Sequence, residues 1–142
     1  MQQESPQPLQ QPTSSSERAR DLMTPGVVAL PIATRLPVAA RALAAHRVHA
    51  VLVLGFDGVP EGWLPAYGLV ALSNTDRSLA WAMRVAGEPI TAVSPFATRS
   101  EVVRELSQPG VNRLAVQERS DWMPEGVISD LDLTASATVD IN

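Results

Sequence analysis

Residues 124–133 read PEGVISDLDL, and a second form of this stretch, PEGWLPAYGL, occupies residues 60–69, 64 positions earlier (124 − 60). A further match at the same spacing relates PIATR at residues 31–35 to PFATR at residues 95–99. Matches that recur in one order at one spacing indicate a duplicated structural unit. We therefore expect two copies of one motif, and the differences between the copies become informative about function.

The first copy shows the residue patterns of a β-α-β-β-α unit. Thr34 is a predicted helix N-cap, and Pro37 is tolerated in the first turn that follows it. Residues 48–54 form a nearly continuous aliphatic and β-branched run, which is typical of a covered strand. The predicted elements are strands at 27–30, 48–54 and 62–64, and helices at 34–47, from 65 or 66 onward, and at 76–85.

The second copy repeats this order. The sequence TRSE at residues 98–101 is a capping-box pattern, so a helix is predicted to begin there. The predicted elements are strands at 90–93, 111–117 and 126–128, and helices at 98–106 and from Ser129 onward. The two copies together predict an α/β (α+β) fold made of tandem β-α-β-β-α repeats.

Composition and repeat boundaries divide the chain into four predicted segments. Residues 1–16 are rich in Gln, Pro and Ser, and such a segment buries too little apolar surface to offset its ordering entropy, so a disordered tail is expected. A short helix near residues 17–23 leads into the first motif. The predicted segments are the tail at 1–16, the first motif with a bridging helix at 17–85, the second motif at 86–135, and a C-terminal tail at 136–142.

The overall charge and the scarce chemistry-bearing residues argue against several functional classes. A formal net charge of −4 argues against nucleic-acid binding. With no cysteine and only two histidines, His46 and His49, we expect no thiolate nucleophile and no metal site. Neither GxGxxG nor GxxxxGK[ST] occurs, so no enzymatic activity is expected. The apolar runs are too short for a membrane helix and no signal peptide is recognisable, so a cytoplasmic protein is expected.

The duplicated order, with Gly-apolar-apolar-Ser-x-x-Asp after the last strand, resembles the cystathionine β-synthase (CBS) domain pair, or Bateman module. The lead-in DLMTP at residues 21–25 is similar to the usual opening of that family, and HRVHAV at residues 46–51 is similar to the entry to its second strand. The resemblance covers about residues 18–135. It implies a pseudo-two-fold pair with a regulatory, non-catalytic role. The family's two clefts commonly take AMP, ADP, ATP or S-adenosylmethionine, and its members often form disc-like dimers. A homodimer and an unidentified protein partner are therefore expected, and no obligatory cofactor.

The motif also makes physical sense for such a ligand. A carboxylate can accept charge-assisted hydrogen bonds from both ribose hydroxyls, and a hydroxyl beside free helix N–H groups suits a phosphate. The resemblance therefore assigns ribose to Asp132 and phosphate to Ser129, with Ile128 beside them. It places the other predicted ligand-binding residues on the opposite wall of the cleft: Thr24, Val28, Val48, His49 and Ala50.

The corresponding site of the first copy departs from the pattern. Pro65 replaces the hydroxyl residue, Gly68 replaces the carboxylate, and Trp63 stands where a small aliphatic is usual. This second site is therefore predicted to be empty or altered, which leaves one working site. Its lining residues would be Leu64, Pro65, Gly68, Val111, Asn112 and Arg113.

Two alternatives remain open from the sequence. Ser129 and Asp132 also fit an ordinary helix start, because Ser is a preferred N-cap and acidic residues suit the first turn. The alternative to ligand binding is that the whole protein is a dimerisation or protein-interaction module that binds no ligand.

Overall fold

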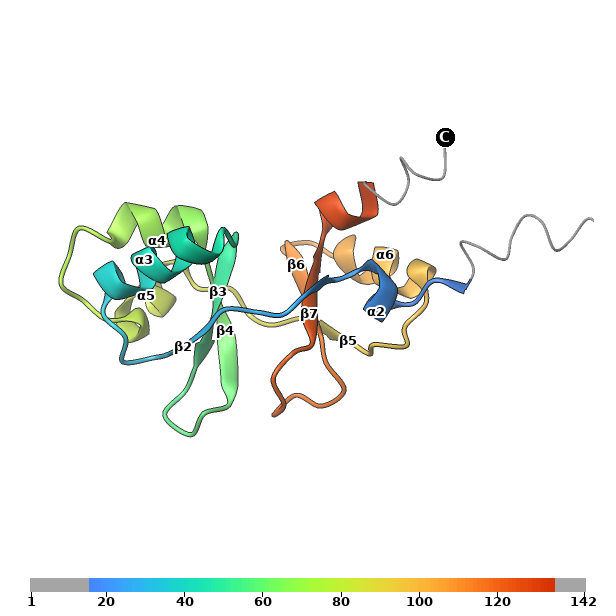
Figure 1. Ribbon diagram of the computed structural model, residues 1–142, viewed down its shortest axis with the longest axis horizontal. Coiled ribbons are helices and arrows are strands. Elements are labelled where there is room, and N and C mark those ends of the chain that lie inside the picture. Colours follow the sequence, from blue (N-terminus) through green and yellow to red (C-terminus); the bar gives the residue numbers. More distant parts are fainter. Residues whose placement is uncertain (1–15, 135–142) are drawn as a thin grey trace, which may run out of the picture. The chain divides into compact units, whose positions relative to one another are not determined.

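The structure is a computed structural model that describes residues 16–134 (Figure 1). The predicted tails at 1–16 and 136–142 lie outside the described residues, apart from Ser16. No helix within the described range is both long and apolar enough to cross a bilayer. The elements are α2 (Ala19–Leu22), β1 (Thr24–Pro25), β2 (Ala29–Pro31), α3 (Leu36–His46), β3 (Ala50–Leu54), β4 (Pro60–Pro65), α4 (Ala66–Leu72), α5 (Leu79–Ala86), β5 (Ala92–Val93), α6 (Arg99–Leu106), β6 (Arg113–Val116) and β7 (Gly126–Ser129). A further helix begins directly after β7 and is described over residues 130–134.

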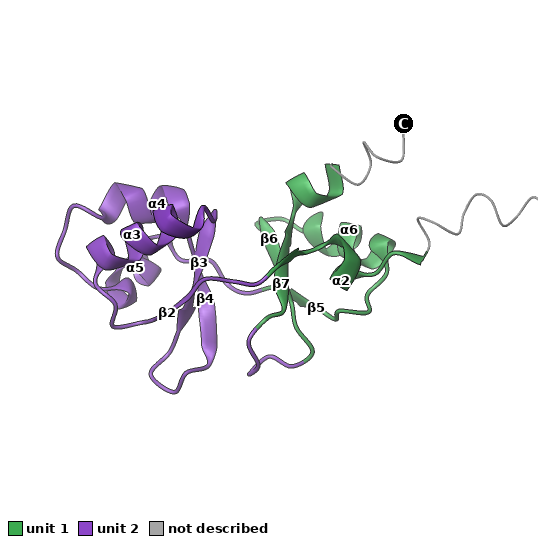
Figure 2. Cartoon of the chain, viewed as in Figure 1, with its two compact units in different colours: residues 1–25, 91–118, 124–142 green, residues 26–90, 119–123 purple. Residues whose placement is uncertain are grey.

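The chain folds into two compact units, which Figure 2 shows in separate colours. Unit 2 contains residues 26–90 and 119–123, while unit 1 contains the described parts of 1–25, 91–118 and 124–142. The unit boundaries do not coincide with those of the sequence repeats, because the lead-in with α2 and β1 packs with the second copy. This packing of the lead-in places Thr24 in the same unit as the Ser-x-x-Asp motif.

Unit 2 is built on a three-stranded sheet in the order β2-β3-β4. β2 runs parallel to β3, and β3 pairs antiparallel with β4. Because side chains alternate across a strand, Val51 and Val53 share one face of the sheet. The helices α3, α4 and α5 contribute to the hydrophobic cluster on this face, whose fully buried members are Leu36, Ala39, Val51, Val53, Leu64, Leu69, Leu79 and Ala82.

Unit 1 repeats this arrangement with one additional strand. Its sheet has the order β1-β7-β6-β5, in which β5 runs parallel to β6 while β6-β7 and β1-β7 are antiparallel. The helices α2 and α6 contribute to its hydrophobic cluster, whose buried members are Ala19, Leu22, Val93, Val102, Leu114, Val116 and Ile128. The predicted α/β class and the duplicated β-α-β-β-α order are confirmed.

The predicted N-cap at Thr34 is wrong. Helix α3 begins at Leu36 with Arg35 at the N-cap, and Arg35 makes no side-chain capping bond. Backbone pairing replaces the cap: the Leu36 N–H donates to the Arg77 carbonyl at 2.8 Å, and the Leu79 N–H donates to the Thr34 carbonyl at 2.8 Å. A bond between segments this far apart in the chain has no local sequence signal.

The glycines of the two Pro-Glu-Gly sequences occupy equivalent positions of close backbone approach. A Cβ on Gly126 would lie 2.5 Å from the Thr24 carbonyl oxygen and 2.6 Å from the Met23 sulfur. A Cβ on Gly62 would lie 2.7 Å from the Glu88 carbonyl oxygen. In each unit the missing side chain therefore lets a neighbouring segment lie directly against the last strand of the motif.

The predicted capping box at the start of α6 is confirmed, and it makes stability depend on pH. The Thr98 N–H donates to the Glu101 carboxylate at 2.7 Å, and the Glu101 N–H donates to the Thr98 hydroxyl at 3.2 Å. These bonds from Thr98 lower the pKa of Glu101 below its usual value. A lowered folded-state pKa contributes stability that is present above the unfolded-state pKa and is lost as the pH falls through the folded-state pKa.

We therefore expect Glu101→Gln to lower the urea midpoint at pH 7 and to have no effect at a pH below the folded-state pKa. Urea unfolding at the two pH values measures this. Glu105→Gln, which changes an acid on the same helix outside the capping box, should show no such pH-dependent difference. An equal loss for Glu101→Gln at both pH values would contradict the capping explanation.

Candidate functional site

Thr24, Ser129 and Asp132 form a polar cluster in unit 1. The Thr24 hydroxyl donates to Oδ1 of Asp132 at 2.9 Å, and the Ser129 N–H donates to Oδ2 at 2.7 Å. The Ser129 hydroxyl lies farther from Oδ2, at 3.4 Å. The structure thus brings together three residues that the resemblance assigned to one ligand site, although 108 positions separate Thr24 from Asp132. The placement of Thr24 on the opposite wall is wrong, because the lead-in segment belongs to the same unit as Asp132.

Two elements position this cluster. In the β1–β7 pair, Thr24 lies opposite Val127 and Pro25 lies opposite Gly126, so the Thr24 side chain reaches the end of β7. Asp132 belongs to the first turn of the helix that follows β7. The Ser129 N–H accordingly bonds to the carboxylate three residues later, as in the reciprocal half of a capping box.

The helix-start interpretation and the ligand interpretation of Asp132 are compatible. A carboxylate has about four lone-pair sites on its two oxygens. The Thr24 hydroxyl occupies one site on Oδ1, while the Ser129 N–H and the longer bond from the Ser129 hydroxyl both fall on Oδ2. Oδ1 therefore keeps acceptor capacity, and Oδ2 can accept a further donor when the Ser129 hydroxyl turns away. Thr24 is exposed and Asp132 is half-buried, so solvent reaches the cluster. The arrangement can therefore accept two hydroxyl donors from one molecule.

Ile128, which the resemblance placed beside the ligand, contributes its side chain to the core. The side chain is fully buried in the hydrophobic cluster of unit 1. A ligand contact at this position would therefore come from the backbone of β7.

The remaining predicted ligand residues lie in unit 2, at the start of the parallel strands β2 and β3. The Val28 carbonyl accepts a hydrogen bond from Leu52 at 2.8 Å, and the His49 carbonyl accepts one from Ala66 at 2.8 Å. Val48 is half-buried and His49 is exposed, while Ala50 is 9% exposed and pairs with the last residue of β4. The ligand contacts assigned to Val28, Val48, His49 and Ala50 stay predictions.

In unit 2 the position equivalent to Asp132 is closed by packing. A Cβ on Gly68 would lie 2.9 Å from the Ala86 methyl carbon at the end of α5. Pro65 is the N-cap of α4 and makes no side-chain capping bond, and Leu64 is fully buried. Trp63 is 2% exposed, so its ring offers no open face. This half of the first-copy site therefore lacks both the carboxylate and the space for one.

The residues that the sequence assigned to the other half of that site belong to unit 1. Arg113 begins β6 and lies directly opposite Ser129 in the β6–β7 pair. Val111 packs at the edge of the unit 1 cluster, and Asn112 is exposed. The prediction that the first-copy site is empty or altered stays a prediction.

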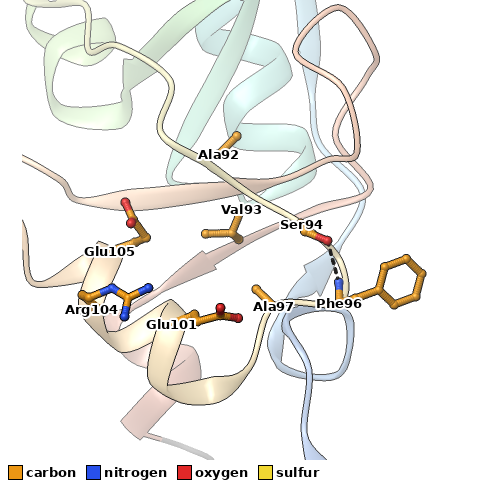
Figure 3. Close-up of a pocket in the computed structure, with 8 residues that line it drawn as sticks. All are labelled: Ala92, Val93, Ser94, Phe96, Ala97, Glu101, Arg104 and Glu105. Carbon is orange, nitrogen blue, oxygen red and sulfur yellow. Dashed lines mark hydrogen bonds between the residues drawn. The ribbon is translucent and has the colours of Figure 1, made fainter.

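A separate shallow hollow of about 390 Å³ lies on unit 1 beside α6 (Figure 3). Val93 and Ala97 give it an apolar floor, while Glu101, Arg104 and Glu105 line it from one side of α6. Its lining includes no member of the Thr24–Ser129–Asp132 cluster, and the Glu101 carboxylate is bonded in the helix cap. The hollow is therefore not the site assigned from the motif.

Sequence reasoning missed Gly126 as a residue of the site. Without a side chain at Gly126, β1 can approach β7 closely enough for the Thr24 hydroxyl to reach Asp132. The available signal was the Gly in both Pro-Glu-Gly sequences, because a glycine inside a strand often marks a close backbone approach. The pattern could not show which segment makes that approach.

Comparison with known families and structures supports the duplicated fold. A family model described as CBS domain matches residues 19–71. No curated protein matches the chain in sequence.

Several solved structures match nearly the whole chain at low sequence identity. The CBS domain pair of MJ0100, in complex with 5′-methylthioadenosine and S-adenosylmethionine, matches with a TM-score of 0.71 and 11% identity, covering 87% of this chain and 98% of that one. CBSX2 in complex with AMP matches with a TM-score of 0.68 and 19% identity, covering 88% and 98%. A CBS-domain-containing protein from Agrobacterium tumefaciens matches with a TM-score of 0.68 and 21% identity, covering 87% and 95%. The family match over residues 19–71 and these fold similarities agree, so the chain has the fold of a CBS domain pair.

Proposed function

We propose that this protein is a non-catalytic regulatory protein that binds an adenosine-containing ligand through the Thr24–Ser129–Asp132 cluster. The ligand is an adenine nucleotide or S-adenosylmethionine, and its occupancy is passed to a partner. The observation that carries the proposal is the Asp132 carboxylate, which is anchored by Thr24 and Ser129 and retains acceptor capacity on Oδ1, and on Oδ2 when the Ser129 hydroxyl turns toward the ligand.

Two further observations support this proposal. The matched structures of MJ0100 and CBSX2 hold adenosine-containing molecules, and both share the fold of this chain. The only other Ser-x-x-Asp position of the repeat reads Pro65 and Gly68, where the space for a side chain is taken by Ala86. Binding through a carboxylate is therefore proposed for one site.

Asp132→Ala is expected to weaken nucleotide binding about ten- to a hundred-fold. The reason is that a hydrogen bond to a charged group contributes about 1.5–3 kcal/mol, and 1.4 kcal/mol corresponds to about a factor of ten in Kd. Isothermal titration calorimetry with AMP, ATP and S-adenosylmethionine measures the change. Heat of binding with none of the three for the wild-type protein would remove the proposal.

Asp130→Ala is the matched control for this experiment. Asp130 is an exposed acid in the same helical turn, and the structure shows no bond from its carboxylate within the described residues. Its removal changes the net charge by the same amount and should leave Kd nearly unchanged. An equal loss of affinity for both variants would indicate a general charge or helix effect in place of a ribose contact.

A ligand-free dimerisation module is the second candidate, and the surface of α4 favours it. Tyr67 and Val70 are 70% and 63% exposed, although large apolar side chains on a helix usually pack. A dimer in light scattering with an unchanged melting temperature across the nucleotide panel would support this candidate. A ligand-dependent increase in melting temperature would favour the nucleotide proposal, because a ligand that binds only the folded state stabilises it.

A further inference from the structure

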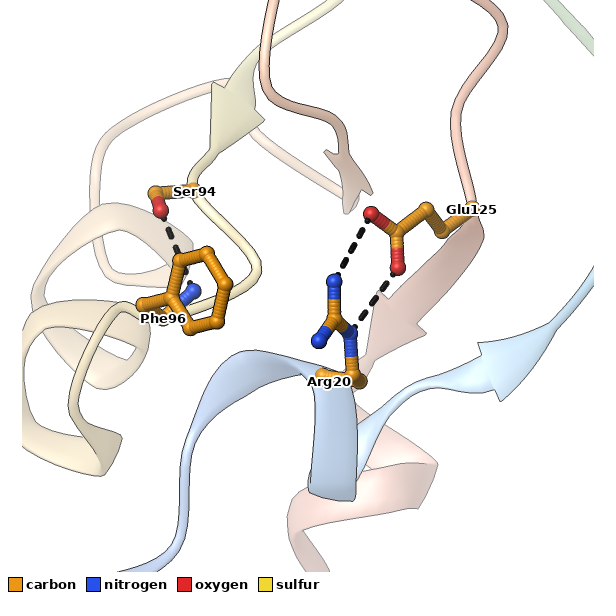
Figure 4. A network of polar contacts seen from close by, with 4 residues as sticks. All are labelled: Arg20, Ser94, Phe96 and Glu125. Atoms are coloured by element: carbon orange, nitrogen blue, oxygen red, sulfur yellow. Dashed lines mark hydrogen bonds and ion pairs between the residues drawn. The ribbon is translucent and has the colours of Figure 1, made fainter.

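Arg20, Glu125 and Phe96 form a stacked ion pair on unit 1 (Figure 4). The Arg20 guanidinium donates to both Glu125 carboxylate oxygens, at 3.0 and 3.2 Å. Its central carbon lies 4.9 Å from the centre of the Phe96 ring, within the range of a cation–π contact. The Phe96 N–H donates in turn to the Ser94 hydroxyl at 3.0 Å, which anchors the backbone that carries the ring. A bidentate arginine–carboxylate pair of this kind restricts both side chains more than a single hydrogen bond does.

This ion pair joins the two segments that bear the ligand cluster. Arg20 belongs to α2, four residues before Thr24, and Glu125 directly precedes β7, which ends at Ser129. β1 itself has only two residues in its pairing with β7, so its own ladder provides few hydrogen bonds. The Glu125 N–H donates to the Val116 carbonyl at 2.7 Å, which ties the acidic end of the ion pair to β6.

The other copy of the repeat provides an internal comparison. At the 64-residue offset, Arg84 corresponds to Arg20 and Glu61 corresponds to Glu125. Both side-chain types are retained, yet within residues 16–134 no ion pair joins Arg84 to Glu61. The Glu61 carboxylate lies against Gly55 instead. The position of Phe96 is taken by Ile32, which has no ring to stack on a guanidinium.

We propose that the Arg20–Glu125 pair is a positioning device for the ligand site, which holds β1 against β7 and so places the Thr24 hydroxyl on the Asp132 carboxylate. The ion pair forms only in the unit that retains Ser129 and Asp132. In unit 2 the same residue types are present, but Pro65 and Gly68 leave no carboxylate to position. This inference rests on the proposed function for its effect on binding, while its effect on the β1–β7 pairing can be measured without any ligand.

The binding experiment compares AMP with 2′-deoxyadenosine monophosphate by calorimetry. Asp132 can accept hydrogen bonds from two ribose hydroxyls only when it is correctly oriented. The Kd for 2′-deoxyadenosine monophosphate divided by the Kd for AMP therefore reports that orientation. Arg20→Gln is expected to lower this ratio about two- to five-fold, because an exposed ion pair makes only a small contribution. A role limited to stability would lower the melting temperature and leave the ratio unchanged, which would overturn the proposal.

Two control variants and one charge-swap variant test whether the effect is specific to the Arg20–Glu125 pair. Arg84→Gln removes the equivalent arginine of unit 2, which forms no ion pair among the described residues, and should leave the ratio unchanged. Arg119→Gln breaks another two-pronged pair, with Asp121 at 3.2 Å, stacked on Trp122 at 5.2 Å. It should also leave the ratio unchanged, because that pair joins residues of one loop. The charge swap Arg20→Glu with Glu125→Arg should recover part of the wild-type ratio. A loss of the ratio in Arg84→Gln or Arg119→Gln equal to that in Arg20→Gln would contradict the inference.

Amide hydrogen exchange by NMR tests the positioning role in the absence of ligand. Arg20→Gln should speed exchange in the β1–β7 pair about two- to five-fold relative to the β6–β7 pair, and Arg84→Gln should not. Pro25 has no N–H, so the amide of Thr24 reports on β1. Unchanged exchange of this amide in Arg20→Gln would refute the positioning role. If exchange changes as expected but the wild-type protein binds neither nucleotide, the positioning role stands and the proposed function fails.

Discussion

Gly126→Ala is expected to separate β1 from β7 and to cost about 1–3 kcal/mol of unfolding free energy, the usual range for overpacking. The added methyl carbon would lie 2.5 Å from the Thr24 carbonyl oxygen, which belongs to the backbone and cannot rotate away. β1 must move, and the Thr24 hydroxyl then leaves the Asp132 carboxylate. We expect a loss of nucleotide affinity of about ten-fold or more, as for removal of a hydrogen bond to a charged group.

Urea unfolding and calorimetry with AMP measure the two effects on the same protein. Gly62→Ala is the matched control, because its methyl carbon would lie 2.7 Å from the Glu88 carbonyl oxygen at the equivalent place in unit 2. It should lower stability to a similar extent and leave the Kd for AMP nearly unchanged. Equal affinities for wild-type protein and Gly126→Ala would show that the close approach of β1 does not position Thr24.

Ile128→Ala is expected to lower the free energy of unfolding strongly, by about 2–5 kcal/mol. Removing a fully buried branched side chain forfeits its transfer free energy and leaves a cavity that the sheet and helices fill only in part. Ile128 is fully buried in the unit 1 cluster, on the strand between β1 and β6. Chemical denaturation followed by circular dichroism measures the loss of stability.

Leu131→Ala and Leu64→Ala are the exposed and the buried comparison variants for Ile128→Ala. Leu131 is 67% exposed, so its truncation should change stability by less than about 0.5 kcal/mol. Leu64 is the equivalent of Ile128 in unit 2 and is also fully buried, so its truncation should cost a comparable amount. A cost for Ile128→Ala no larger than that for Leu131→Ala would be inconsistent with the core assigned to unit 1.

Most helices and strands could be predicted because their signals are local. The aliphatic run before Leu54 predicted a covered strand, and the TRSE sequence predicted the start of α6, which the structure confirms. The prediction of Thr34 as N-cap was wrong because the Leu36 N–H donates to the carbonyl of Arg77, which is far along the chain. β1 was not predicted because two residues that include a proline carry no strand pattern by themselves.

The candidate site also has one part that could be predicted from local sequence and one part that could not. Ser129 and Asp132 could be named from the sequence, since the carboxylate and the hydroxyl lie three residues apart at the start of one helix. The bond between Thr24 and Asp132, however, depends on which sheet receives the lead-in segment.

The duplicated motif, the α/β class and the loss of the carboxylate at Gly68 were determined by the amino-acid sequence alone, because repeat spacing and residue chemistry are properties of the chain. Only the tertiary structure decided that the lead-in joins the second copy, that Ala86 closes the space beside Gly68, and that Arg20 pairs with Glu125 while Arg84 and Glu61 stay apart. The physical reason is that these features depend on contacts between residues far apart in sequence. Their free energies are set by packing and close approach in the folded state, which no local pattern encodes.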